Sequence, residues 1–367
     1  MRLLIAPDGF KGTLRADEAA AAIARGWQRR RPDDEILQRP LSDGGPGFVH
    51  AIAAARGVAV RHTSVAHALG GMVDAAWCLD GSSAFLEAAE AVGLDRGLDV
   101  ERATSVGLAA LLREAVAAGA RTIVVGLGGT AVVDAGAGLL AGLGATAVDA
   151  EGAPVPLDAG PRALARVASV NLAPALALLE GVELIAAVDV DVPLLGARGA
   201  VQGFAQQKGA DPEDLPALES AIGAFSAACG RRVDGKDAAV MLGAGAAGGL
   251  GFALFRLGGS RASGLRRVWD DSRIDLAGID LVITGEGSLD WQSLEGKVVS
   301  GVAMRAQERG TPIIAIAGRV LISPRERIDL GLDAAYSLVD IVGEERALGD
   351  PAGALADAAE RLVRTWG

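Results

Sequence analysis

The chain has 367 residues, of which 50% are hydrophobic and 22% are charged, and its formal net charge is −11. This length and composition allow two ordinary domains with full cores and exclude a disordered, collagen-like or disulfide-stapled protein. The acidic balance repels phosphate backbones, so we expect no nucleic-acid partner, and any anionic substrate must meet cations that are placed locally.

The cysteine content and the hydropathy of the sequence indicate the cellular compartment in which the protein works. The two cysteines, Cys78 and Cys229, are too few and too far apart in the sequence for a metal knuckle. No signal-peptide pattern follows Met1, and no apolar run has the length and flanks of a membrane span. We therefore expect a cytoplasmic protein with no membrane partner.

The first elements alternate between strand and helix. Residues 2–6, which are apolar after Arg2, predict a strand, and residues 35–41 predict a second one. Between them, residues 16–31 begin with acidic side chains and end with three arginines, which is typical of a helix whose charges match its macrodipole. The loop after the first strand holds Asp8 and Lys11, at the position where α/β sheets bind ligands.

The same alternation recurs along the chain. Further short β-rich runs, separated by Ala-rich helical stretches, lie at residues 122–125, 183–188, 280–284, 312–316 and 334–338. This pattern predicts an α/β protein with parallel or mixed sheets covered by helices, and residues 351–366 predict an amphipathic helix at the end. Polar or glycine-interrupted stretches predict domain boundaries near residues 75 and 265.

Five loops rich in glycine or acidic residues follow predicted strands. They lie at residues 6–12, 41–45, 126–130, 188–191 and 284–287. Glycine lets backbone N–H groups close on phosphate oxygens, a following helix adds its positive end, and carboxylates hold Mg²⁺. A single such loop is more typical of a tight turn with a helix cap. Together the five loops indicate a magnesium-nucleotide site.

Other well-known site patterns are weak or missing. Residues 243–248 match the glycine spacing of a dinucleotide-binding loop after the apolar run 238–242, but 51 glycines make a chance match easy, which favours helix packing or a phosphate loop. No P-loop motif and no G-x-S-x-G elbow occurs. The three histidines, His50, His62 and His67, lack metal-ligand spacing.

Lysine is rare in this chain. It occurs only at Lys11, Lys208, Lys236 and Lys297, each beside a glycine, and all other basic side chains are arginines. Chance placement explains this pattern, and so does a need for compact ammonium groups where bare backbone holds an anion.

The motifs resemble those of the type I glycerate kinases. The resemblance begins at residues 6–14 (APDGFKGTL) and continues in order at residues 42–45, 104–105, 126–129, 188–194, 206–210, 243–251 and 285–290, with Gln292, Gly296 and Lys297. It implies phosphorylation of D-glycerate by ATP with Mg²⁺, most often at the 2-hydroxyl. It also implies a Rossmann-like domain with a mixed α/β domain inserted, expected at residues 1–75 plus 265–367 and at 76–264, with the active site in the cleft between them.

The predicted catalytic residues are Asp189, Lys11 and Lys297. Asp189 or Asp191 would orient or deprotonate the glycerate hydroxyl or hold Mg²⁺, and the lysines would neutralise the transferred phosphate or bind the carboxylate. The predicted metal ligands are Asp191, Glu286 and Asp290. The predicted substrate- and nucleotide-binding residues are Asp8, Asp43, Gly44, Gly45, Gly128, Gly129, Thr130, Gly285, Glu286, Gly287 and Gln292.

Five positions depart from the pattern of the family. This chain has Pro46, Phe48, Val133, Val192 and Ser288 where the family usually has Glu, Thr, Asn, Asn and Arg. The losses remove hydrogen-bonding groups and one bidentate anion clamp. Two alternatives to a glycerate kinase therefore stay open: a catalytically silent relative that binds a small anion or a partner protein, and a kinase of another hydroxy acid. A dehydrogenase that binds its cofactor at residues 243–248 is a third alternative. A homodimer is also left open.

Overall fold

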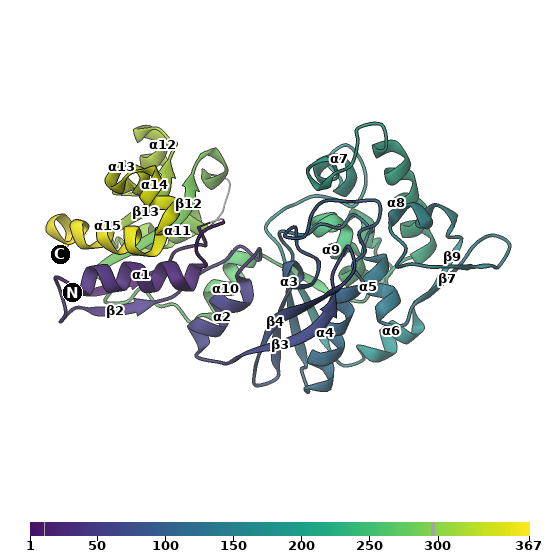
Figure 1. Ribbon diagram of the computed structural model, residues 1–367. Helices are drawn as coiled ribbons and strands as arrows, with labels where there is room; N and C mark the ends of the chain where they lie inside the picture. The colour runs from purple at the N-terminus through teal and green to yellow at the C-terminus, as the bar shows by residue number, and fades with distance from the viewer. Residues whose placement is uncertain (11, 295–297) are drawn as a thin grey trace. The chain divides into compact units, whose positions relative to one another are not determined.

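The computed structural model describes residues 1–10, 12–294 and 298–367, apart from the side chain of Gln292. The chain divides into two compact units (Figure 1). Unit 1 consists of Met1–Asp43, His50–Gly57 and Leu265–Gly367, and unit 2 consists of Gly44–Val49 and Val58–Gly264. Unit 2 is therefore an insertion within the sequence of unit 1.

Unit 1 is built on a fully parallel five-stranded sheet. Its strand order is β14-β13-β12-β1-β2. The strands are β1 (Arg2–Ile5), β2 (Glu35–Gln38), β12 (Leu281–Leu289), β13 (Ile313–Val320) and β14 (Ala334–Ser337). The winding direction reverses between β1 and β12, and in doubly wound sheets such a switch point forms the ligand crevice outside the carboxyl ends of the strands.

Helices accompany the strands of unit 1. They are α1 (Ala16–Gln28), α11 (Val298–Arg309), α12 (Pro324–Asp329), α13 (Leu338–Val342), α14 (Glu344–Gly349) and α15 (Pro351–Trp366), with the short η4 (Trp291–Leu294). Among them, α1, α11 and α15 bury most of their apolar side chains, whereas α12 buries none. Two more helices, α2 (Phe48–Arg56) and α10 (Gly264–Asp271), begin in segments of unit 2 and continue into unit 1. The core of the α1 side includes Ile23 and Trp27 of α1, Leu355 of α15 and Ile283 of β12.

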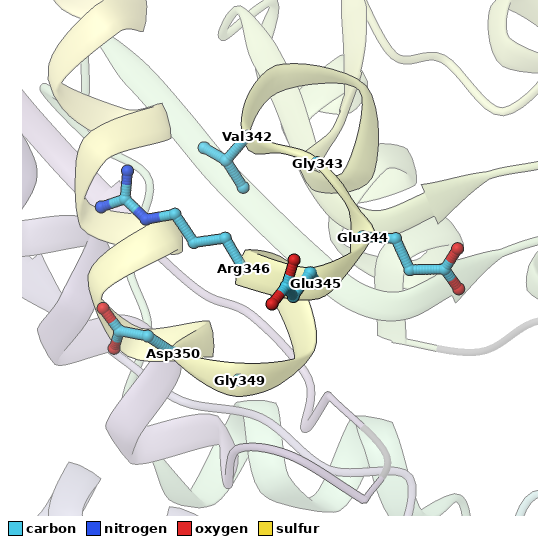
Figure 2. A pocket seen from close by; sticks show the side chains of 7 residues that line it. All are labelled: Val342, Gly343, Glu344, Glu345, Arg346, Gly349 and Asp350. Atoms are coloured by element: carbon cyan, nitrogen blue, oxygen red, sulfur yellow. The ribbon is translucent and has the colours of Figure 1, made fainter.

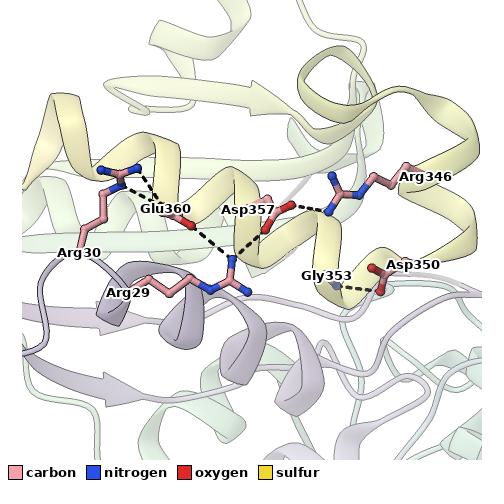
Figure 3. A network of polar contacts seen from close by, with 7 residues as sticks. All are labelled: Arg29, Arg30, Arg346, Asp350, Gly353, Asp357 and Glu360. Atoms are coloured by element: carbon pink, nitrogen blue, oxygen red, sulfur yellow. Dashed lines mark hydrogen bonds and ion pairs between the residues drawn. The ribbon is translucent and has the colours of Figure 1, made fainter.

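Ion pairs on the surface link α1 and α15. Arg29 contacts Asp357 at 2.7 Å and Glu360 at 3.3 Å, and Arg30 contacts Glu360 at 3.0 Å. Figure 3 shows these side chains and their contacts. Arg346 pairs with the other oxygen of Asp357. Because exposed pairs each contribute little free energy, the buried apolar faces supply most of the attraction between the two helices.

Unit 2 holds a six-stranded mixed sheet in the order β11-β10-β6-β5-β4-β3. The strands are β3 (Val60–Ala66), β4 (Met72–Asp80), β5 (Ser83–Glu87), β6 (Thr122–Gly126), β10 (Glu183–Ala187) and β11 (Ser260–Ala262). β5, β6, β10 and β11 are parallel, while β3 and β4 form an antiparallel hairpin beside β5. The carboxyl ends of the four parallel strands therefore meet at one edge.

Helices and a small second sheet complete unit 2. The second sheet has the order β8-β7-β9, from Pro154–Val155, Thr146–Val148 and Ser169–Asn171. The helices are α3 (Ala88–Val92), α4 (Val106–Ala117), α5 (Ala137–Gly142), α6 (Ala173–Leu178), α7 (Ala200–Phe204), α8 (Leu215–Cys229) and α9 (Ala246–Arg256). The 3-10 helices are η1 (Pro161–Arg166), η2 (Gln206–Lys208) and η3 (Ala238–Val240).

The α/β class predicted from the sequence is confirmed, and the C-terminal helix has the predicted bounds. The boundary expected near residue 75 is displaced in the structure. Residue 75 lies inside β4, whose pairing with β3 places residues 60–80 in unit 2, and the chain first enters this unit at Gly44. The apolar run 238–242, which a dinucleotide-binding loop would require to be a strand, contains the 3-10 helix η3 instead.

A search of the described helices finds none with the length and hydropathy needed to span a membrane.

Asp34 ties the start of the chain to the end of α1. Its carboxylate accepts hydrogen bonds from the Met1 ammonium at 2.8 Å, from Trp27 Nε1 at 2.9 Å and from Arg31 Nε at 3.3 Å, and its side chain is 4% exposed. Burial by itself raises the pKa of Asp34, but these donors outweigh that effect and lower the pKa from 3.8 to about 2.

Asp34→Asn should therefore destabilise the protein. A carboxylate whose pKa is lowered on folding stabilises the protein above its unfolded-state pKa, and this stabilisation is lost as the pH falls from about 4 towards 2. We expect the free energy of unfolding at pH 7 to fall by about 2 kcal/mol. Urea denaturation at several pH values measures it, with Asp33→Asn at the exposed neighbouring position as the control. A deficit that does not shrink below pH 4 contradicts this account.

Candidate active site

In unit 1, three strand ends meet at the switch point of the sheet. The loop after β1 runs beside β12, because Ala6 N donates to Ile283 O and Asp8 N donates to Gly285 O, both at 2.8 Å. The chain after β2 joins the same edge, because Leu41 N donates to Pro7 O at 2.9 Å. The predicted residues Asp8, Asp43, Gly285, Glu286 and Gly287 thus lie on adjacent loops or strand ends of one edge.

The carboxylates of this edge differ in their surroundings. Glu286 is 8% exposed on β12, whereas Asp8 is half-buried and accepts a hydrogen bond from Gly9 N at 2.7 Å. Asp290 follows the end of β12, and its N–H donates to Ser293 Oγ at 3.1 Å. The edge is therefore acidic in its described part, which suits a cation held together with an anionic ligand.

Strands β12 and β13 continue past the end of β1 as a two-stranded ribbon. Their pairing extends to Ser288 with Arg319 and Leu289 with Val320, whereas β1 pairs with β12 only as far as Ile283. Glu286 still lies within the sheet, since its partner Ala317 also pairs with Ser337 of β14, and the ribbon carries the segment from Ser288 onward beyond the body of the sheet.

Lys11 and Lys297 lie outside the described residues, as does the side chain of Gln292, whose backbone belongs to η4. The roles predicted for these three residues stay predictions. The predicted cleft between the two domains stays a prediction as well.

In unit 2, the segment Gly44–Gly45 passes directly over the carboxyl ends of β6 and β10. A Cβ on Gly44 would lie 2.7 Å from Ala187 O, and a Cβ on Gly128 would lie 2.6 Å from Gly45 Cα. Neither position has room for a side chain, so these glycines allow two backbones to touch. The loop after β6 is thereby held against the segment 44–45, which places its N–H groups at the edge where phosphate-binding loops act.

Glu87, at the end of β5, fixes the residues that directly follow this segment. Its buried carboxyl accepts hydrogen bonds from Gly47 N at 3.0 Å and from Val49 N at 3.3 Å. Burial, reinforced by the charge of Glu90, raises the pKa of Glu87 to about 8. Sequence reasoning missed this residue because it did not recognise the strand that ends there.

Lys208 supports the loop after β6 from within the core. Its ammonium donates to Val132 O at 2.8 Å and to Thr130 Oγ1 at 3.3 Å, and the residue is 5% exposed. Burial lowers the pKa of Lys208 to about 8, while the charge of Asp134 opposes the shift. Because a hydroxyl that accepts one hydrogen bond can still donate its own proton, Thr130 keeps the capacity to bind an oxyanion.

Asp134 orders the continuation of this loop. Its fully buried carboxylate accepts hydrogen bonds from Ser105 Oγ at 2.7 Å, Ser105 N at 2.8 Å and Gly136 N at 3.0 Å. Burial raises the pKa of Asp134, although these donors act against the shift. The sequence singled out Lys208 as a lysine beside a glycine but gave it no role, and it gave no signal for Asp134.

Asp189 and Asp191 follow β10 and both contact the chain at the end of β11. Asp189 Oδ1 accepts a hydrogen bond from Gly264 N at 3.0 Å, and Asp191 forms an ion pair with Arg261. The side chain of Asp191 is 65% exposed. Asp189 is therefore the more constrained of the two carboxylates, whereas Asp191 has a guanidinium as its partner.

No group of three or more Asp, Glu, His or Cys side chains within the described ranges could hold a metal ion by itself. Mg²⁺ in phosphotransfer sites usually takes one or two carboxylates and completes its shell with substrate phosphates and water. The carboxylates of Asp8 and Glu286 at the switch point suit this mode. The predicted ligand set of Asp191, Glu286 and Asp290 stays a prediction.

The dinucleotide interpretation of residues 243–248 is wrong. No strand leads into this segment, which follows η3, and its glycines serve the packing of α9. A Cβ on Gly248 would lie 1.8 Å from Val132 O. The segment thus packs against the loop that Lys208 supports.

Three of the five departures from the glycerate kinase pattern are apolar contacts around the loop after β6. Phe48 is fully buried and packs on Phe85, with ring centroids 6.4 Å apart. Val133 is fully buried beside Asp134. Pro46 is exposed and lies against Gly129, where a Cβ would come within 2.6 Å of the proline ring. These three side chains therefore give the surroundings of the loop an apolar character.

The hollow beside α14 is a poor candidate for an anionic ligand. It measures about 490 Å³ and is lined by residues 342–346, 349 and 350, among them Glu344, Glu345 and Asp350 (Figure 2). Arg346, its one arginine, is paired with Asp357. An acidic lining of this kind repels phosphate and carboxylate groups.

A doubly wound sheet with carboxylates at its switch point, and a second sheet whose strand ends carry a glycine-rich loop, define an α/β enzyme of small anionic ligands. Comparison with known proteins gives the family. The family model described as the glycerate kinase family matches residues 3–367. The chain belongs to the glycerate kinase family and is a kinase.

Individual relatives agree over nearly the whole chain. The glycerate 2-kinase of Escherichia coli K12 is 36% identical, with 94% of this chain and 92% of the relative covered. An uncharacterized protein of Mycobacterium bovis is 40% identical, with 99% and 89% covered. A crystal structure described as glycerate kinase 2 of Salmonella typhimurium LT2 superposes with a TM-score of 0.85 at 36% identity, covering 100% of this chain and 98% of the other.

Lys208→Met should impair catalysis by loosening the loop after β6. Without the ammonium, Val132 O loses its buried donor and Thr130 loses its support. We expect kcat/KM to fall roughly ten-fold or more, as for other losses of buried charged hydrogen bonds. Steady-state kinetics measures the effect, and Lys236→Met, at a lysine whose side chain is 71% exposed, is the matched control. Equal kinetics in the two variants would show that Lys208 does not position the loop.

Proposed function

We propose that this kinase transfers the γ-phosphate of ATP to D-glycerate, at the 2-hydroxyl. The supporting observation is the pair of loops, Gly44–Gly45 and residues 126–130, packed backbone to backbone at the carboxyl edge of the sheet in unit 2. The order of motifs and the names of the relatives support the same reaction, and the E. coli relative is named for the 2-kinase activity.

Phosphoryl transfer requires positioning and charge neutralisation more than covalent chemistry by the protein. The N–H groups of Gly128 and Gly129 and the hydroxyl of Thr130 would donate to phosphate oxygens, on a loop that Lys208 holds in place. Lys11 and Lys297 would neutralise the transferred phosphate or bind the carboxylate of the substrate.

Asp189 would orient the acceptor hydroxyl and accept its proton. Its carboxylate already receives the Gly264 N–H, which fixes one oxygen and leaves the group an acceptor with further lone pairs. When bound, Mg²⁺ would neutralise part of the triphosphate charge. Asp8 and Glu286 at the switch point, with Asp290 beyond it, are the carboxylates that would hold the ion in unit 1.

The decisive experiment mixes the purified chain with Mg-ATP and D-glycerate and measures ADP release. Phosphorus NMR of the product then distinguishes 2-phosphoglycerate from 3-phosphoglycerate. We expect glycerate-dependent ADP release and the 2-phospho product. Faster ADP release with another hydroxy acid than with D-glycerate would show that this other acid is the phosphate acceptor. Binding of the ligands without ADP release would show that the protein is a catalytically silent relative of the kinases.

Asp189→Asn should lower turnover by roughly 10² or more, because the amide cannot accept the hydroxyl proton. The variant keeps a side-chain oxygen for Gly264 N, so we expect the fold to survive, as judged by circular dichroism and melting temperature. Asp211→Asn, at an exposed position in the same unit, is the control. Wild-type turnover in Asp189→Asn would remove this residue from the catalytic step.

A further inference from the structure

Arg319 stands across the strand pair from the acidic end of β12. Ser288 and Arg319 are register partners in the parallel β12–β13 ribbon, and Glu286 pairs with Ala317 two residues earlier. Side chains alternate between the faces of a strand, and register partners share a face, so Glu286, Ser288 and Arg319 all belong to the same face of the sheet. The arginine is therefore placed next to the predicted binding segment and on its side.

The carboxylates at this edge of the unit 1 sheet explain why an arginine there would favour the binding of an anion. The described carboxylates Asp8, Glu286 and Asp290 would repel an anionic substrate unless cations lie among them. Guanidinium binds carboxylate and phosphate oxygens through two parallel hydrogen bonds, which also fixes their orientation. Ser288 cannot do this, whereas its cross-strand partner Arg319 carries such a group.

The present partner of Arg319 is weakly held. The guanidinium forms an ion pair with Glu344 at the start of α14, and the two side chains are 50% and 56% exposed. Figure 2 shows that Glu344 extends away from Arg346 and Asp350, so it does not belong to the ion pairs between α14 and α15. An exposed pair of this kind contributes little free energy, and a substrate oxyanion can replace the carboxylate at small cost.

We propose that Arg319 is an anion-binding, specificity-determining residue of this enzyme, which exchanges Glu344 for a carboxylate or phosphate oxygen of the substrate. The inference rests on the proposed kinase function.

Steady-state kinetics with D-glycerate and Mg-ATP varied in turn tests this role and identifies the source of the oxyanion. In Arg319→Gln, KM for one of the two should rise roughly ten-fold or more, with a much smaller change in kcat, because a charged hydrogen bond is lost from binding. Arg319→Lys should restore part of the affinity, since it keeps the charge without the fork. Glu344→Gln should lower the same KM by up to about five-fold, because it removes the internal competitor.

Calorimetric titration of the wild type and Arg319→Gln with each compound gives a readout that does not need turnover. Arg325→Gln, at an exposed arginine of α12, is the matched control and should behave as the wild type. If both KM values and both dissociation constants of a folded Arg319→Gln variant stay within about two-fold of the wild type, the inference is overturned. If the wild-type protein is inactive with D-glycerate, the proposed function is overturned. The role of Arg319 in anion binding is then tested by the dissociation constant for Mg-ATP alone.

Discussion

The close approach of two backbones at the carboxyl edge of unit 2 is the constraint on which the rest of the site depends. The segment Gly44–Gly45 touches the end of β6 and the loop after it so closely that neither Gly126 nor Gly128 could carry a Cβ. Glu87 secures one partner through backbone N–H groups, and Lys208 secures the other through Thr130 and Val132. Preorganised donors are effective in phosphoryl transfer because they need no rearrangement when charge develops. The buried titratable groups of this region therefore serve loop geometry.

Unit 1 also has an α/β sheet with candidate ligand-binding residues at the carboxyl ends of its strands, but these residues are mainly acidic. Its switch point between β1 and β12 gathers carboxylates, and the β12–β13 ribbon extends this acidic edge outward to Arg319. Because these carboxylates repel anionic ligands, an anion can bind at this edge only if cations lie beside them. The arginine of β13 is the cation that the described part of this edge offers for this purpose.

Much of this was readable from the sequence, because parallel strands buried on both faces are apolar runs bounded by glycine and acidic residues. Strands such as β1, β6 and β10, and the loops after them, stood out for that reason. The β3–β4 hairpin did not, because its alternating polar residues and Gly70–Gly71 turn resemble a linker. Lys208 and Asp134 could not be assigned, since their roles depend on contacts between segments tens of residues apart.

The discontinuity of unit 1 has a consequence for biogenesis. β1 pairs with β12 across some 280 positions of sequence, whereas the parallel strands of unit 2 all lie within one continuous stretch. On a ribosome, the inserted unit emerges complete while β1 and β2 still lack their central neighbour, and contacts of such long separation form slowly. The unpaired edge of β1 is then open to intermolecular pairing until translation passes residue 289. Nascent chains stalled short of β12 would thus be the aggregation-prone species of this protein.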